Sequence, residues 1–202
     1  GVVAMPDSVE QVSRLLAMAN EAGFSVVPWG GGTAMSLGGI PPRVDIVLST
    51  ARLAKVLDYS PEDMTITAQA GATLATLEKL MAEHGQMLPL DPPLPERSTV
   101  GGVLATNASG PLRYQFGMPR DLALGAVVVY ADGTVAKSGG RTVKNVAGYD
   151  MTRLHIGAYG TLGVIVEATF KVAPLPKVQV TVAGQFDSLA GAGAAARALR
   201  MA

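Results

Sequence analysis

The segment Val26-Val27-Pro28-Trp29-Gly30-Gly31-Gly32-Thr33 carries a short apolar stretch directly into three consecutive glycines. An apolar run of this length is typical of a buried strand, and glycines after it let the chain turn tightly. Several backbone N–H groups can then point into one concavity, which favours an anion such as a diphosphate. A flexible turn without a ligand is the alternative, because the spacing matches neither GxGxxG nor a P-loop.

A second glycine-rich segment runs from Ser98 to Gly110 and mixes small residues with hydroxyl and amide side chains. Short side chains let a planar ligand approach closely, and a few hydrogen-bonding groups satisfy its polar ring atoms. Close packing of a helix on a strand would explain the glycines, but it explains Thr99, Thr106 and Asn107 less well. We therefore favour a ligand-binding wall in this segment.

A third glycine-rich region lies between Gly139 and Ile165. Gly160 and Gly163 flank a turn that enters a buried strand, which brings the backbone close to whatever lies beside it. Arg141 and Lys144 could offer charge to a substrate or to phosphates, and they could equally be solvated cations.

Composition excludes several classes of function. The 202 residues contain 16 Lys and Arg against 16 Asp and Glu, a balance that argues against a nucleic-acid binder. Cysteine is absent and His84 and His155 are the two histidines, so we expect no thiolate or multi-histidine metal site and name no metal ligand. No apolar run is long enough to span a bilayer, and no secretory signal opens the sequence. We expect a cytoplasmic protein without a direct membrane span.

The hydrophobic periodicity predicts a series of strands and helices, with a second lobe that begins near Thr50. In the first lobe, residues 1–50, we expect strands at 2–4, 25–28 and 45–48 and a helix from Val9 to Gly23. For the second lobe, residues 51–176, we expect strands at 56–59, 64–69 and 162–172, helices at 74–85 and 150–156, and a hairpin at 124–137 with a type I′ signal at Asp132-Gly133. Residues 177–202 should begin a truncated C-terminal region, with a strand at 179–186 and a helix at 189–201.

Gly30 to Thr33, Ser98 to Gly102 with Ala105-Thr106-Asn107, and Gly160 to Ile165 occur in the order and spacing of a known family. The chain resembles the FAD-binding domain of the vanillyl-alcohol oxidase and p-cresol methylhydroxylase type over nearly its whole length. The segment 144–150 makes it most similar to the FAD-binding subunits of bacterial glycolate oxidases. This resemblance implies an α+β fold of two α/β lobes with FAD extended between them.

The resemblance also implies which residues hold FAD. The backbone of Gly30 to Thr33 would hold the pyrophosphate, the segment from Ser98 to Gly110 would line the flavin and ribityl groups, and the last long strand would contact the cofactor. The loop from Pro89 to Pro93 would lie nearby. The implied cofactor-binding residues are Trp29, Gly30, Gly31, Gly32, Thr33, Ser98, Thr99, Gly101, Gly102, Thr106, Asn107, Gly110, Gly163 and Ile165.

The chain departs from the family pattern at several positions. Many relatives have arginine where this chain has Trp29, and Ala158-Tyr159 replaces a Ser-Glu pair that often precedes Gly-Thr-Leu-Gly. Some relatives attach flavin through histidine or cysteine, and neither residue occurs in the loop 29–37, so the resemblance implies non-covalent FAD. We interpret His155 as a packed histidine and name no catalytic residue. We also expect a Gly31→Asp variant to place a carboxylate against the diphosphate and to weaken FAD retention.

The resemblance implies a flavin-dependent oxidoreductase that acts on a 2-hydroxy acid such as glycolate. It further implies partner subunits of an oxidase complex, through which the protein could lie at the inner membrane. The main alternative is a non-catalytic FAD-holding electron-transfer subunit. A fragment that binds no flavin and the FAD domain of a molybdenum hydroxylase are further alternatives.

Overall fold

The computed structural model describes residues 1–140 and 150–201. Its N-terminal part is a three-stranded parallel sheet in the order β1-β3-β2, formed by β1 (Val2–Ala4), β2 (Val26–Trp29) and β3 (Ile46–Ser49). The helix α1 (Val9–Glu21) connects β1 to β2. Its Ser8 cap accepts a hydrogen bond from the Gln11 N–H, 3.2 Å away, and Val12, Leu16 and Ala19 recur at helical spacing and are buried.

The second sheet is five-stranded and antiparallel, in the order β4-β5-β9-β7-β8. The strands are β4 (Val56–Ser60), β5 (Thr65–Gln69), β7 (Ala123–Val129), β8 (Val135–Gly139) and β9 (Val164–Lys171). A further pair of short strands, β6 (Gln86–Met87) and β10 (Ala173–Pro174), is antiparallel. The remaining elements are α2 (Leu74–Ala82), α3 (Val100–Thr106), α4 (Arg113–Phe116), α5 (Pro119–Leu122), α6 (Met151–His155) and α7 (Leu189–Met201).

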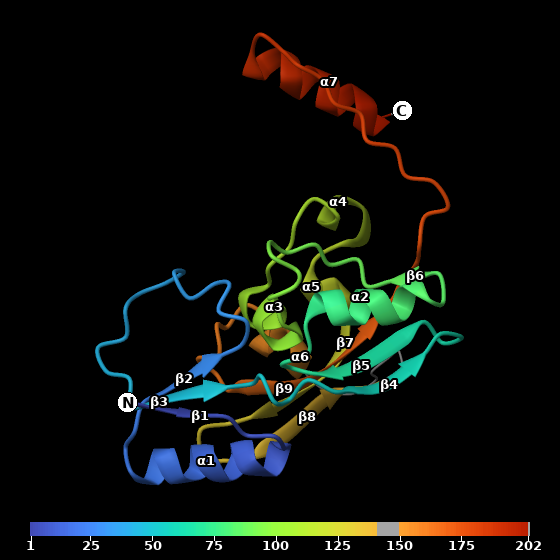
Figure 1. The fold of residues 1–202 in the computed structure, drawn as a ribbon. Helices are drawn as coiled ribbons and strands as arrows, with labels where there is room; N and C mark the ends of the chain where they lie inside the picture. The colour runs from blue at the N-terminus through green and yellow to red at the C-terminus, as the bar shows by residue number, and fades with distance from the viewer. Residues whose placement is uncertain (141–149, 202) are drawn as a thin grey trace.

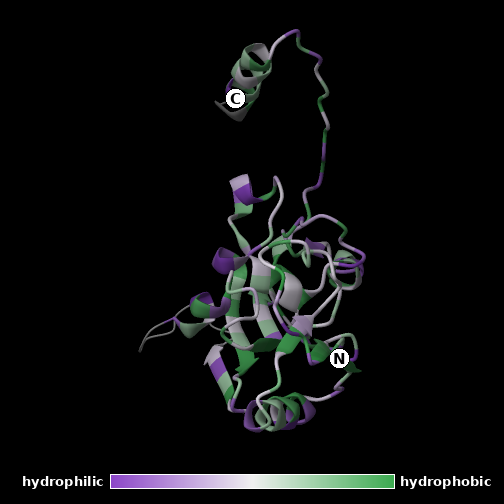
Figure 2. Ribbon diagram, turned by 90° about the vertical axis from the view of Figure 1, so that its left-hand side faces the viewer, coloured by the Kyte–Doolittle hydropathy of each residue, from purple (hydrophilic) through white to green (hydrophobic). Residues whose placement is uncertain are grey.

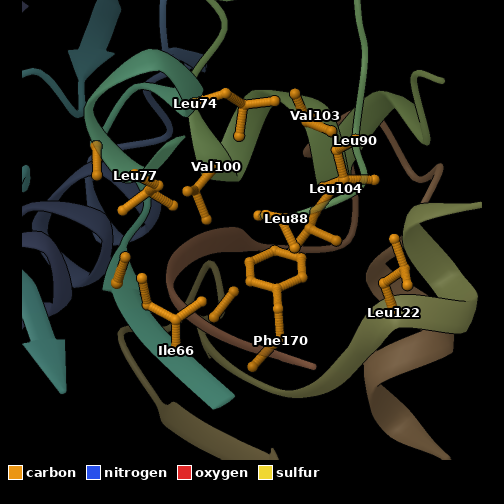
Figure 3. Close-up of a cluster of buried hydrophobic side chains, with 14 of the residues drawn as sticks. Ile66, Leu74, Leu77, Leu88, Leu90, Val100, Val103, Leu104, Leu122 and Phe170 are labelled. Atoms are coloured by element: carbon orange, nitrogen blue, oxygen red, sulfur yellow. The ribbon is translucent and has the colours of Figure 1, made fainter. Parts of the chain in front are cut away.

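The main hydrophobic core lies between the five-stranded sheet and the helices α2, α3 and α5 (Figure 1). Phe170 on β9 points into it and is surrounded by Leu88, Leu104 and Ile66 (Figure 3). Each of these side chains is at least 97% buried, so the core is well sealed from water. In Figure 2 the central strands are mostly hydrophobic, whereas α1 carries hydrophilic residues among hydrophobic ones.

A second core joins the two sheets. Val12 and Leu16 of α1 pack together with Leu48 of β3 and with Val129 and Val164 of the five-stranded sheet. Because this contact fixes one sheet against the other, the end of β2 and the beginning of β9 lie close to each other (Figure 1). The predicted α+β class is therefore observed, while the lobe boundaries at residues 50 and 176 stay predictions.

Two local expectations are wrong. Residues 179–186 form no strand. The segment is extended and leads away from the sheets to α7 (Figure 1). Its alternating Val178, Val180 and Val182 are exposed, and no strand among the described residues pairs with it. The hairpin between β7 and β8 does not use a type I′ turn, because Gly133 has a positive φ of 85° and Asp132 does not. The Gly133 N–H donates to the Tyr130 carbonyl at 2.9 Å, as in a type I turn followed by a left-handed glycine.

Candidate cofactor-binding site

A cavity of about 700 Å³ opens between the two sheets. The end of β2 and the loop after it form one wall, α3 forms another, and the turn before β9 closes the third side. Among the described residues that line it, no side chain belongs to Asp, Glu, Lys, Arg, His or Cys. Among the described residues, an anion in this cavity can therefore be bound by backbone N–H groups and by hydroxyl side chains such as that of Thr33.

The loop Gly30 to Met35, which we call the amide loop, follows β2 and lines this cavity. None of its backbone N–H groups donates to a partner within the part of the chain that the structure describes. Unpaired amides are costly unless water or a ligand satisfies them, and several amides in one concavity form an anion site. The loop thus offers a run of donors at the wall of a cavity whose described lining has no charged side chain.

Close packing explains two of the glycines in the amide loop. A Cβ atom on Gly31 would overlap the carbonyl oxygen of Arg97, and Gly32 has a φ of 69°. The Arg97 Nη2 donates to the Gly31 carbonyl at 3.2 Å and holds the loop in place. The expected loss of FAD retention in Gly31→Asp stays a prediction, but its cause would be steric, because a Cβ at this position would meet the Arg97 backbone.

The helix α3 presents small residues to the cavity, namely Gly101, Gly102, Ala105 and Thr106. Its first amides are already satisfied: Val100 N–H donates to Ala72 O at 2.9 Å, and Gly101 N–H donates to Ala70 O at 2.8 Å. The cap residue Thr99 accepts from the Gly102 N–H at 3.3 Å. An anion in the cavity therefore finds its free donors in the amide loop and not at the beginning of α3.

The third wall is a turn between α6 and β9. Gly157 and Tyr159 donate their N–H groups to the carbonyls of Leu104 and Ala105, at 3.0 and 2.8 Å, so the turn is anchored on the end of α3. A Cβ on Gly160 would lie 3.1 Å from Pro28 of β2. The turn consequently closes over the end of β2.

The structure brings most of the predicted cofactor-binding residues to this one cavity. Those that line it are Trp29, Gly30, Gly31, Gly32, Thr33, Gly101, Gly102, Thr106, Gly163 and Ile165. Residues that the sequence interpretation did not include are also in the lining, among them Thr50, Ala105 and Tyr159. The sequence signal that could have found Tyr159 is the replacement of a Ser-Glu pair by Ala158-Tyr159.

Four predicted residues lie outside the cavity lining. Ser98 is buried, its Oγ donates to Pro93 O at 2.7 Å, and Thr33 Oγ1 lies 3.5 Å from the same Ser98 Oγ, so Ser98 supports the amide loop. Thr99 caps α3, and the Gly110 N–H donates to Asp91 Oδ1 at 2.8 Å. Asn107 ends α3 with a φ of 51°, and its buried Oδ1 has no partner among the described residues. Cofactor contacts for these four residues stay a prediction.

The side chain of His155 lies outside the cavity lining and is only 4% exposed. Its Nε2 lies 3.4 Å from the Tyr130 hydroxyl, while its Nδ1 has no partner within the described residues. Burial lowers the pKa of this imidazole because it disfavours the charged form. The candidate cations Arg141 and Lys144 fall outside the residues that the structure describes.

Two searches of residues 1–140 and 150–201 gave negative findings. No three His, Cys, Asp or Glu side chains gather there in a group that could hold a metal ion. No helix in this part of the chain is both long enough and apolar enough to cross a membrane.

Residues 1–139 match the model of a protein family described as an FAD binding domain. The chain belongs to this FAD-binding family. Its cofactor is accordingly FAD, and the cavity fits it, because the unpaired amides can satisfy a diphosphate and the glycines on α3 leave room for a flat ring system.

Curated relatives support the assignment. The chain is 33% identical over 187 residues to glycolate oxidase subunit GlcD of Bacillus subtilis, which covers 93% of this chain and 40% of that protein. It is 37% identical over 199 residues to D-2-hydroxyglutarate dehydrogenase of Xanthomonas citri pv. viticola, covering 97% of this chain and 42% of that protein. The chain thus spans less than half the length of either relative.

A solved structure of alkyldihydroxyacetonephosphate synthase has the same fold, with a TM-score of 0.75 and 31% sequence identity. The match covers 87% of this chain and 32% of that one. The resemblance to FAD-binding domains of the p-cresol methylhydroxylase type is therefore confirmed, together with the predicted fold class.

Proposed function

We propose that this chain holds FAD non-covalently within an oxidoreductase that acts on a 2-hydroxy acid such as glycolate. The observation that carries the proposal is the amide loop, which lines the cavity and whose N–H groups have no partner among the described residues, while the described lining has no charged side chain. A diphosphate carries charge that must be matched by donors, and preorganised amides in a partly enclosed site do this well. The names of the two relatives, a glycolate oxidase subunit and a 2-hydroxyglutarate dehydrogenase, support the substrate class.

Each wall of the cavity has a distinct role in this proposal. The amide loop binds the diphosphate, and Ser98 keeps the loop in place through Thr33. The small residues of α3 let a planar ring approach the backbone, and the Thr106 hydroxyl, which donates to Gly102 O at 2.7 Å, keeps its oxygen free to accept. No histidine or cysteine among the described lining residues is available to attach flavin covalently.

The chemistry of the proposed reaction is divided between cofactor and protein. When bound, FAD supplies a hydride acceptor for the carbon that bears the hydroxyl group of the substrate. The described lining residues bind and orient the cofactor, and none of them is a carboxylate or an imidazole that could take the hydroxyl proton at neutral pH. We therefore name no catalytic residue in this chain and assign the base to another part of the protein or to a partner subunit.

The same absence of a base in the described lining favours a second candidate function. An FAD-holding electron-transfer subunit of a larger oxidase complex needs the diphosphate site but no group that touches the organic substrate. In both cases we propose a cytoplasmic protein that reaches the inner membrane only through partner subunits.

Flavin content and anaerobic reduction test these proposals. The purified protein should be yellow, and acid precipitation should release intact FAD into the supernatant and leave no flavin on the protein. If the protein oxidises the substrate itself, glycolate added without oxygen should bleach its flavin. Bleaching only after a partner subunit is added would favour the electron-transfer role. A colourless protein that does not take up added FAD would refute the proposed function.

A further inference from the structure

Two aromatic side chains from distant parts of the sequence line the same cavity. Trp29 is the last residue of β2, and Tyr159 lies in the turn before β9. Their exposed fractions are 39% and 54%, which is high for large rings at the wall of a cavity. Gly160 approaches Pro28 closely, since a Cβ atom built on Gly160 would lie 3.1 Å from the Pro28 ring. The turn with Tyr159 and the end of β2 therefore lie side by side.

Hydrogen bonds hold the backbone of both Trp29 and Tyr159 in place. Trp29 pairs with Ser49 in the parallel sheet, and its carbonyl accepts from the Thr50 N–H at 3.0 Å. Its indole packs on Gly32, where a Cβ would lie 2.8 Å from Cζ2. Tyr159 has a φ of 54°, and its N–H donates to Ala105 O at 2.8 Å. A non-glycine residue adopts this left-handed conformation only at a cost, and such strained residues cluster at ligand clamps.

Neither ring has an aromatic or cationic partner among the described residues. The ring contacts of the structure join other residues, namely Tyr59 with His84, Tyr130 with His155, and Arg113 with Tyr114. Both side chains line the cavity and are partly exposed, so they are available to a planar ligand. The described lining has no charged side chain, so aromatic stacking is the interaction that it offers to a neutral planar ring.

We propose that Trp29 and Tyr159 hold the adenine ring of FAD by stacking. The inference rests on the proposed function, in which the amide loop binds the diphosphate and the segment Ser98 to Gly110 lies on the flavin side. Trp29 directly precedes the amide loop, and the turn with Tyr159 reaches from the end of α3 to Pro28 of β2. We therefore place the adenine ring on the β2 side of the diphosphate. Tyr159 is then a cofactor-binding residue that sets affinity for the adenine half of FAD.

The single tryptophan of the chain makes this arrangement directly observable. ADP contains the adenine and the diphosphate but no flavin, so it cannot quench indole fluorescence by energy transfer to flavin. We expect ADP to quench the emission of Trp29 in a saturable way, and FAD to compete with it. Binding of ADP by calorimetry without any change in Trp29 emission would contradict stacking on this ring.

Variants of Tyr159 test the second ring. Tyr159→Asn tolerates the left-handed backbone but removes the ring, and loss of one base-stacking contact should weaken binding of FAD and of ADP about tenfold. Tyr159→Phe should restore binding, and FMN, which lacks adenine, should bind wild type and Tyr159→Asn equally. The control Tyr114→Asn removes an exposed tyrosine outside the cavity and should leave all affinities unchanged.

The outcomes separate the inference from the proposed function. If wild-type protein binds FAD tightly and both Tyr159→Asn and Trp29→Leu bind it with unchanged affinity, stacking on these rings is refuted. The proposed function would remain. A selective loss of FMN binding would also overturn the stacking of adenine, since the rings would then hold the flavin. Wild-type protein that binds neither FAD nor ADP would overturn the proposed function itself, and the inference with it. Circular dichroism confirms that each variant is folded.

Discussion

The amide loop depends on the close approach of Gly31 to Arg97, and a single methyl group there tests its role. In Gly31→Ala the new Cβ would overlap the Arg97 carbonyl oxygen, whereas real Cβ contacts are essentially never shorter than 3.0 Å. The amide loop must therefore move by more than an ångström. N–H···O bonds weaken beyond about 3.2 Å, so this shift should remove about two charge-assisted bonds to the diphosphate. At about 1.5–3 kcal/mol each, the loss is at least about a hundredfold in FAD affinity.

Two matched glycine variants control this experiment. Gly39→Ala adds the same methyl group to the cavity lining but meets no atom within 4 Å, so its affinity for FAD should stay close to wild type. Gly133→Ala strains the hairpin, because Gly133 has a φ of 85° and the new Cβ would lie 2.8 Å from the Ser13 carbonyl oxygen. It should lower the melting temperature without changing FAD affinity. Wild-type FAD affinity in folded Gly31→Ala, measured by calorimetry, would refute this account of the loop.

Three further predictions concern the core, the end of α3 and the buried histidine. Phe170→Ala should lower the free energy of unfolding by about 3–5 kcal/mol in urea titrations, because Phe170 is completely buried; a loss below about 1 kcal/mol would contradict the core assignment. Asn107→Gly keeps the left-handed end of α3, so its melting temperature should stay near wild type while FAD binding weakens by about 1 kcal/mol; unchanged affinity would remove Asn107 from the site. Burial lowers the pKa of His155, so the unfolded state binds its proton at higher pH, and stability should fall as pH drops below about 6.5. His155→Gln should lose less stability than wild type between about pH 7.5 and about pH 5, and equal losses would exclude His155 as the cause.

The strands and helices with strong periodicity were predictable from the sequence. The helix after Ser8 and the long strand before Val172 bury a face that their sequence pattern predicts, and the strand that ends at Trp29 forms as expected but is only half-buried. The valines at 178, 180 and 182 show the limit of this approach. They alternate as in a strand, but a strand needs a neighbour for its backbone, and the described residues provide none.

The site was only partly predictable for a related reason. The glycines of the amide loop predicted a tight turn. The sequence could not show that Gly31 packs against Arg97, which is far away along the chain. The short helix α3 was missed, because its two glycines disfavour a helix and only packing on Ala70 and Ala72 makes it favourable. Tyr159 reaches the cavity through the contact of its turn with α3, which no local pattern specifies.

The account rests on backbone amides of Gly30 to Met35 that bind the diphosphate of FAD. Amide proton and nitrogen chemical shifts of the labelled protein, recorded during a titration with FAD, test this directly. We predict that the amides of this loop shift strongly and become protected from hydrogen exchange at saturation, while those of the hairpin around Gly133 do not change. Saturation with FAD that leaves the amides of Gly30 to Met35 unshifted and freely exchanging would contradict the account.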